Sequence, residues 1–151
     1  MTLFYEDFEI GRQFESRARR VSNSDIQRFA EVTGDLNRLH VDEEYAKSTI
    51  FRRPIAHGMF TLSLALGLWY SLDLTRESMI AFMGITDVSF QAPVYADDMI
   101  HLSSTVASRR ESRSRPAAGL VTFRDEMINS RNEIVMISER TLLLRKKGNP
   151  A

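Results

Sequence analysis

An acidic, an amide and an imidazole side chain lie within six residues in the first third of the chain. They are Asp35, Asn37 and His40, in the segment Asp-Leu-Asn-Arg-Leu-His. Near neutral pH a carboxylate and an imidazole can both accept from one water molecule, and either can pass a proton on. Asn37 can orient a ligand without changing charge. The three predict a site that activates water. The alternative is that Asp35 closes an Asx-type turn and His40 is an ordinary structural histidine.

A second histidine, His57, directly precedes Gly58 at the start of the most apolar segment of the chain. If a helix begins there, its first N–H groups lack internal partners and carry partial positive charge. Gly58 would let a substrate oxygen come close to the backbone, so its N–H is a candidate for polarising a carbonyl. The alternative is that the glycine only eases a tight transition from loop to helix.

Water held by Asp35 and His40, facing a polarised carbonyl, suggests two chemistries. One is addition of water across a double bond conjugated to the carbonyl, and the other is hydrolysis at the carbonyl itself. A serine-nucleophile triad is disfavoured because the sequence has no Gly-x-Ser-x-Gly segment. We expect no metal, because the histidines have no partner at i+4 and no paired acidic residues at helical spacing. We expect no nucleotide cofactor, because the known glycine-rich phosphate motifs are missing.

The composition narrows the function classes further. The 151 residues suit a single domain, spanning 1–151, and the 20 basic and 20 acidic residues give no net charge. A neutral chain is not expected to bind nucleic acid, and a chain without cysteine has no disulfide or thiol nucleophile. The N-terminal residues 1–10 do not resemble a signal peptide, and the apolar stretch 59–74 is too polar to span a membrane. We therefore expect a cytoplasmic protein with no membrane partner.

Helices are predicted in the first half of the chain. Ser22 or Ser24 can cap a helix over 25–33, which Gly34 would end in the left-handed conformation. A loop over 35–41 follows, and then a short helix over 43–47 that Asp42 would cap. A long helix is expected from His57. Its residues are apolar on nearly every side, so we expect it to be buried on nearly every side.

Strands are predicted at both ends of this helical block. One spans 13–21, and four more form a meander in the second half; these cover 79–90, 99–108, 118–129 and 133–144, with a hairpin tip over 109–116. This order indicates an α+β fold with an antiparallel sheet wrapped around the long central helix. Such a sheet has free edges, and pairing of two copies along an edge would give a homodimer.

The site segment also resembles a known family. The residues Asp35 to His40 and the later Pro-Ile-Ala-His-Gly-Met segment, 54–59, resemble the MaoC-like dehydratases, the (R)-specific enoyl-CoA hydratases of hot-dog fold. The segments 5–11 and 90–98 resemble that family too, so the resemblance covers nearly the whole chain. It departs at Arg38, where the family often has proline, and at Leu66, where some bacterial members have a serine.

The resemblance implies a function and a set of roles. Family members are dimers or larger assemblies that add water to 2-enoyl-CoA thioesters or run the reverse reaction, without a cofactor. Carried onto this chain, Asp35 and His40 would hold and activate the water, Asn37 would fix their arrangement, and the Gly58 N–H would bind the thioester oxygen. The substrate-binding residues would be His57, Phe51 and Met59.

Two other functions remain compatible with the same sequence. One is an acyl-CoA thioesterase, another activity found on the hot-dog fold. The other is a non-catalytic module that binds acyl-CoA or assembles with an enzyme, because fold does not determine function. The sequence does not distinguish among short linear, branched dicarboxylic and aromatic acyl groups as the substrate. Arginines at 52–53 and at 109–115 are alternative partners for the CoA phosphates.

Overall fold

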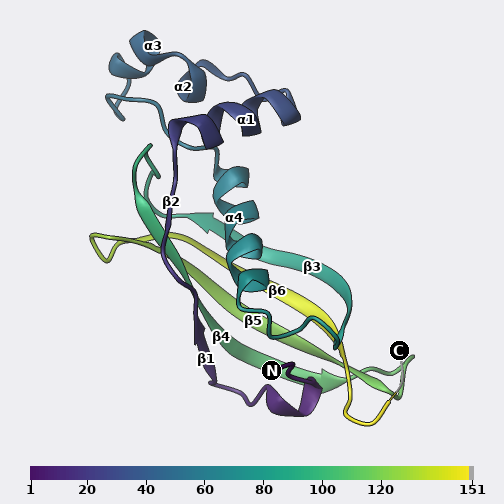
Figure 1. The fold of residues 1–151 in the computed structure, drawn as a ribbon. Helices are drawn as coiled ribbons and strands as arrows, with labels where there is room; N and C mark the ends of the chain where they lie inside the picture. Colours follow the sequence, from purple (N-terminus) through teal and green to yellow (C-terminus); the bar gives the residue numbers. More distant parts are fainter. Residues whose placement is uncertain (150–151) are drawn as a thin grey trace.

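A curved antiparallel sheet wraps around one long helix, α4 (Gly58–Ser71), in the computed structural model, which describes residues 1–149 (Figure 1). Three short helices, α1 to α3, form a cap at the N-terminal end of α4 (Figure 1). The α+β architecture and the central helix predicted from the sequence are confirmed.

The strands of the sheet lie in the order β1-β4-β5-β6-β3, and β2 also pairs with β4. Their bounds are β1 (Gln13–Glu15), β2 (Arg19–Arg20), β3 (Met79–Phe90), β4 (Met99–Glu111), β5 (Ala118–Asn129) and β6 (Ile134–Arg145). The meander is confirmed for the last three strands. It is wrong for β3, which pairs with β6 at the opposite edge. The segment 91–98 leaves the sheet after β3 and pairs instead with the segment before α4, through a bridge between Tyr95 and Ile55.

The helix ends follow local capping signals. Helix α1 (Asn23–Thr33) begins at Ser22, whose side chain accepts from the Asp25 N–H, and ends at Gly34 with φ +75°. Helix α3 (Glu43–Lys47) begins at Asp42, whose carboxylate accepts from the Tyr45 N–H. Helix α4 follows His57 directly. The caps of α1 and α3 and the start of α4 were predicted from the sequence, because a cap depends on residues within one turn of the helix end. Helix α1 begins two residues earlier than predicted.

Three local predictions are wrong in detail. The expected strand 13–21 is broken into β1 and β2. The expected loop 35–41 contains a helical turn, α2 (Arg38–Val41), which the Asn37 side chain caps by accepting from the Leu39 N–H. The hairpin tip is shorter than predicted, because β4 continues through Arg109 and Arg110 to Glu111. In that strand the arginines pair with β5 through the backbone and keep their side chains exposed.

Helix α4 is less enclosed than its composition predicts. One side packs into the sheet, where Leu64, Ala65, Leu68 and Trp69 are buried. The other side is open, and Met59, Ser63, Gly67 and Tyr70 are exposed along it. No described helix is long and apolar enough to cross a bilayer.

Candidate active site

Asp35 and Asn37 lie in the loop between α1 and α2, and His40 lies on α2 itself. Gly34 turns the chain out of α1, and the Asp35 side chain then accepts from the Asn37 N–H at 3.3 Å. Asn37 caps α2, which carries His40 on its third residue. The Asx-type turn foreseen as an alternative for Asp35 is therefore present, and it helps to hold His40 beside the start of α4.

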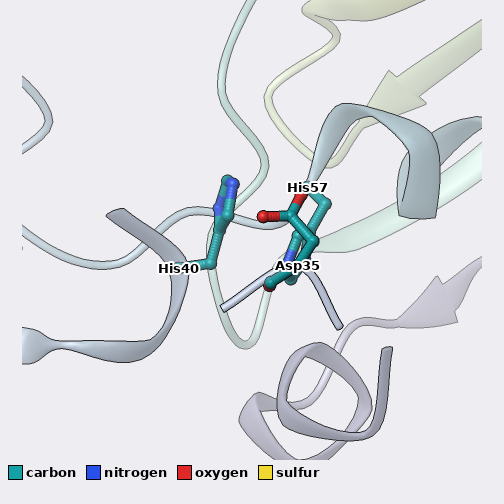
Figure 2. Close-up of side chains that lie close together, drawn as sticks. All are labelled: Asp35, His40 and His57. Carbon is teal, nitrogen blue, oxygen red and sulfur yellow. The ribbon is translucent and has the colours of Figure 1, made fainter. Parts of the chain in front are cut away.

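Asp35, His40 and His57 gather in one place (Figure 2). One potential ligand atom from each lies within 4.8 Å of the other two. A single water molecule can bridge groups at this separation with two hydrogen bonds of about 2.8 Å each. The imidazole rings of His40 and His57 lie with centroids 3.9 Å apart and planes inclined by 30°.

Hydrogen bonds to carbonyl oxygens fix the tautomer of each neutral ring. Nδ1 of His40 lies 2.8 Å from the Ile55 oxygen, and Nε2 of His57 lies 3.0 Å from the Asp35 oxygen. A carbonyl oxygen only accepts, so these nitrogens carry the hydrogens. His40 therefore keeps its lone pair on Nε2. His57 keeps its own on Nδ1, which is buried and has no hydrogen-bond partner among residues 1–149.

The surroundings of His40 favour its neutral form. Burial lowers the pKa of His40 below the ordinary 6.5, and the nearby His57 ring lowers this pKa further. The hydrogen bond to Ile55 and the charge of Asp35 act in the opposite direction, but the net direction is downward. A neutral imidazole with a free lone pair can act as a base near pH 7.

The same three residues are of types that can bind a metal ion. A shared ion would have to lie in the plane of both rings, at about 2.0–2.1 Å from one nitrogen of each. Ring planes inclined by 30° with centroids 3.9 Å apart direct the lone pairs side by side and not towards one point. We therefore assign no metal to this cluster.

An apolar cavity of about 280 Å³ lies next to the cluster. Its lining combines two of the expected catalytic residues with mostly apolar neighbours, and contains no acidic or arginine side chain: His40, Phe51, Ile55, Ala56, Gly58, Thr61, Phe90, Gln91, Ala92, Pro93, Val94 and Val135. A neutral, apolar hydrocarbon group fits such a lining better than a charged one.

Gly58 begins α4 at the wall of this cavity, and its N–H has no acceptor among residues 1–149. A Cβ at this position would lie 2.7 Å from two ring atoms of Phe90. The structure thus gives a steric reason for glycine, in addition to the approach of a ligand that the sequence suggested.

The expected site residues are placed as follows. His40, Phe51 and Gly58 line the cavity, and Asp35 lies within the cluster beside it. Asn37 is occupied with the cap of α2. His57 is 2% exposed and Met59 is 59% exposed, and neither lines the cavity. The catalytic and binding roles themselves stay predictions.

Sequence reasoning missed part of the cavity wall. Phe90 and Val135 belong to β3 and β6, far along the chain from the loop, and Thr61 follows one turn after Gly58. No local pattern marks these residues. The only signal was the resemblance of the segment 90–98 to the hydratase family.

Comparison with known proteins identifies the family of the chain. The family model described as "MaoC like domain" matches residues 7–126. The chain belongs to the MaoC-like family. Within it, the (R)-specific enoyl-CoA hydratase of Rhodospirillum rubrum is 30% identical over 145 residues, which cover 96% of this chain and 94% of the relative.

Solved structures support the same placement. A protein from an Archaeoglobus species, named a monoamine oxidase regulatory protein, superposes with a TM-score of 0.90 at 38% identity, covering 99% of this chain and 97% of its own. A Mycobacterium tuberculosis protein described as a double hotdogfold has a TM-score of 0.83 at 18% identity, covering 99% of this chain and 46% of its own. The MaoC-like chain therefore has the hot-dog fold.

Proposed function

We propose that this protein adds water to a 2-enoyl-CoA thioester to give the (R)-3-hydroxyacyl-CoA, or catalyses the reverse dehydration. The observation that carries the proposal is the meeting of Asp35 and His40 within bridging distance of one water, beside a cavity that also contains Gly58. The name of the R. rubrum relative supports the same reaction. The cytoplasmic location expected from the sequence stays a prediction.

In the proposed reaction, the acyl chain lies in the apolar cavity and the water lies between Asp35 and His40. One of these groups takes a proton from the water as its oxygen bonds to C3. The electron pair of the C2–C3 double bond moves towards the thioester carbonyl, where the Gly58 N–H stabilises the enolate-like oxygen. The other group of the pair gives a proton to C2. The O–H bond of water and the π bond between C2 and C3 thus break, while a C–O and a C–H bond form.

The active unit is proposed to be a homodimer built along β3. Among residues 1–149 one edge of this strand is unpaired. Seven of the 14 large exposed apolar residues lie on it or on the open side of α4: Met59, Tyr70, Ile80, Phe82, Met83, Val88 and Phe90. The β3 strands of two copies can pair antiparallel about a two-fold axis. This pairing would cover the same apolar patch on both copies.

The test is the reaction of purified protein with crotonyl-CoA. Loss of the conjugated-enoyl absorbance without release of free thiol, giving the (R)-3-hydroxyacyl ester, is the expected result. Thiol release would assign the protein to the thioesterases. CoA-ester binding with no reaction of crotonyl, branched or aromatic substrates would support a non-catalytic module, a role that the name of the Archaeoglobus relative keeps open.

A further inference from the structure

The cavity accounts for an acyl group but not for the phosphates of a CoA thioester, because none of its lining residues is charged. The sequence offered two arginine clusters, 52–53 and 109–115, as alternative partners for these phosphates, and the two differ in their distance from the cavity. The hairpin 112–117 adjoins Arg145, the last residue of β6, while the cavity is lined by Val135 near the start of that strand. Ten residues of extended strand are roughly 33 Å, so within one chain the hairpin lies far from the cavity.

The other cluster, Arg52 and Arg53, lies in a segment that forms part of the cavity wall. Phe51 and Ile55 both line the cavity, and Arg52 and Arg53 lie between them in the chain. Both arginines are exposed, and neither makes an ion pair or a side-chain hydrogen bond with any residue from 1 to 149. Their donors are therefore free for an anion from outside the chain.

Arg53 is held in place without being neutralised. Its guanidinium carbon lies 4.0 Å from the centre of the Tyr95 ring. An aromatic ring covers one face of a guanidinium while the N–H groups point outwards in its plane, where they can bind phosphate oxygens in pairs. Stacking also reduces the side-chain entropy that binding an anion would otherwise cost.

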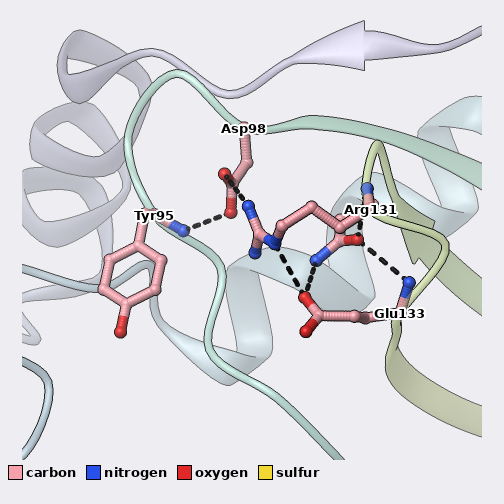
Figure 3. Close-up of polar contacts among 5 residues, drawn as sticks. Tyr95, Asp98, Arg131 and Glu133 are labelled. Atoms are coloured by element: carbon pink, nitrogen blue, oxygen red, sulfur yellow. Dashed lines mark hydrogen bonds and ion pairs between the residues drawn. The ribbon is translucent and has the colours of Figure 1, made fainter.

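Tyr95 is itself fixed on both sides. Its N–H donates to Asp98 Oδ2 at 2.9 Å, and Asp98, 7% exposed, also faces Arg131, which bonds Glu133 (Figure 3). The Tyr95 hydroxyl donates to the Phe51 oxygen at 3.4 Å, and a bridge joins Tyr95 to Ile55. The Tyr95 ring is thus a rigid platform attached to the same wall that encloses the cavity.

The length of the pantetheine arm matches this placement. From the thioester sulfur to the first phosphorus the arm has about thirteen bonds, the length of roughly four extended residues, or about 14 Å. Arg53 precedes Gly58 by five residues, so their backbones are at most about 17 Å apart. A thioester oxygen at Gly58 therefore leaves the diphosphate within reach of the Arg53 side chain.

We propose that Arg53, stacked on Tyr95, binds the diphosphate of CoA and so anchors the thioester whose acyl group enters the cavity. The assignment rests on the proposed function for the identity of the ligand. A phosphate also ends the pantetheine arm of a carrier protein, so the test includes both kinds of thioester.

The test compares Arg53→Ala with a matched control, Arg17→Ala, and with Arg53→Lys. Arg17 is exposed, forms no ion pair within residues 1–149 and lies beside β1 and β2, away from β3. For Arg53→Ala we expect about a tenfold rise in KM for crotonyl-CoA, the effect of losing a charged hydrogen bond. We expect no change with crotonyl-pantetheine, which has no phosphate. The KM of Arg53→Lys for crotonyl-CoA should lie between those of the wild type and Arg53→Ala, because lysine keeps the charge but not the planar pair of N–H donors.

Calorimetric titration with CoA alone provides a readout that does not depend on turnover. A Kd about ten times weaker for Arg53→Ala than for Arg17→Ala supports the assignment even if no hydration is found, in which case only the proposed function fails. Hydration of crotonyl-CoA with equal kinetics in both variants overturns the assignment and leaves the function standing. An effect confined to a crotonyl-carrier protein, or no binding of CoA at all, also overturns it.

Discussion

The imidazole rings of His40 and His57 lie nearly stacked, with centroids 3.9 Å apart and planes inclined by 30°. Two imidazolium ions would repel each other at this distance, and the His57 ring is one of the causes that lower the pKa of His40. The single N–H of neutral His57 is committed to the Asp35 oxygen. His40 thus lines the cavity with a free lone pair, while His57 links the loop to the start of α4 through its hydrogen bond to the Asp35 oxygen.

The first prediction concerns the pH dependence of turnover. Because the pKa of His40 lies below 6.5 in the folded protein, it should be neutral at pH 7, and kcat/KM should fall only as the pH drops below 6.5. Unfolded chains bind this proton more readily, so the free energy of unfolding should also decrease as the pH falls below 6.5. Initial rates and urea titrations across pH 5 to 8 measure both effects, and an acid limb above 6.5 would contradict the argument.

The second prediction concerns His57 as a positioning residue. His57→Gln keeps an N–H donor near the Asp35 oxygen, whereas His57→Ala removes it. The alanine variant should lose about tenfold in kcat, the worth of one hydrogen bond, and glutamine should restore most of it. In both variants the acid limb should move to higher pH, because the His57 ring no longer lowers the pKa of His40. Equal kcat values and an unmoved limb would show that His57 is only a packing residue.

The third prediction concerns the two proposed acid–base groups. Asp35→Asn and His40→Ala should each lower kcat for crotonyl-CoA by about 10²-fold or more, as expected for loss of a general acid or base. Circular dichroism should show the folded state for both, because Asp35 is exposed and His40 is only partly buried. Normal turnover in either variant would remove that residue from the mechanism.

Local signals made much of the helical cap predictable. Ser22, Gly34 and Asp42 define helix ends through contacts within a few residues, so their roles can be derived from the sequence. The meeting of Asp35 and His40 was predictable for the same reason, since they are only five residues apart in the chain.

Contacts between distant segments were not predictable in this way. The pairing of β3 with β6 joins Phe90 to Met136, and it brings Phe90 and Val135 to the same cavity. The alternation of apolar and polar residues indicates where a strand lies in the sequence but does not indicate which strand pairs with it. The open side of α4 escaped prediction too, because residue hydrophobicity alone does not show that the sheet covers only part of the helix.

The fourth prediction concerns a buried ion pair beneath α4. Arg140 bonds both oxygens of Asp125, and its Nη2 also donates to Ser104 Oγ at 3.1 Å. Arg140→Met leaves the buried Asp125 charge without its cation, with only the Ser104 hydroxyl still donating to it, which should lower the free energy of unfolding by about 3–5 kcal/mol. Arg140→Met with Asp125→Leu should lose much less than the sum of the single changes. Urea titration of the three variants tests this, and additive losses would contradict the coupling.

The fifth prediction tests the proposed dimer. Met83 is 54% exposed on the edge strand β3, and Val32 is 82% exposed on α1. If two copies pair along β3, Met83→Lys places two like charges in a desolvated interface and should shift the protein towards the monomer. Val32→Lys adds the same charge on the helical cap and should leave the mass unchanged. Light scattering after size exclusion measures both. A wild-type monomer would reject the dimer, and an unchanged mass for Met83→Lys would place the interface elsewhere than along β3.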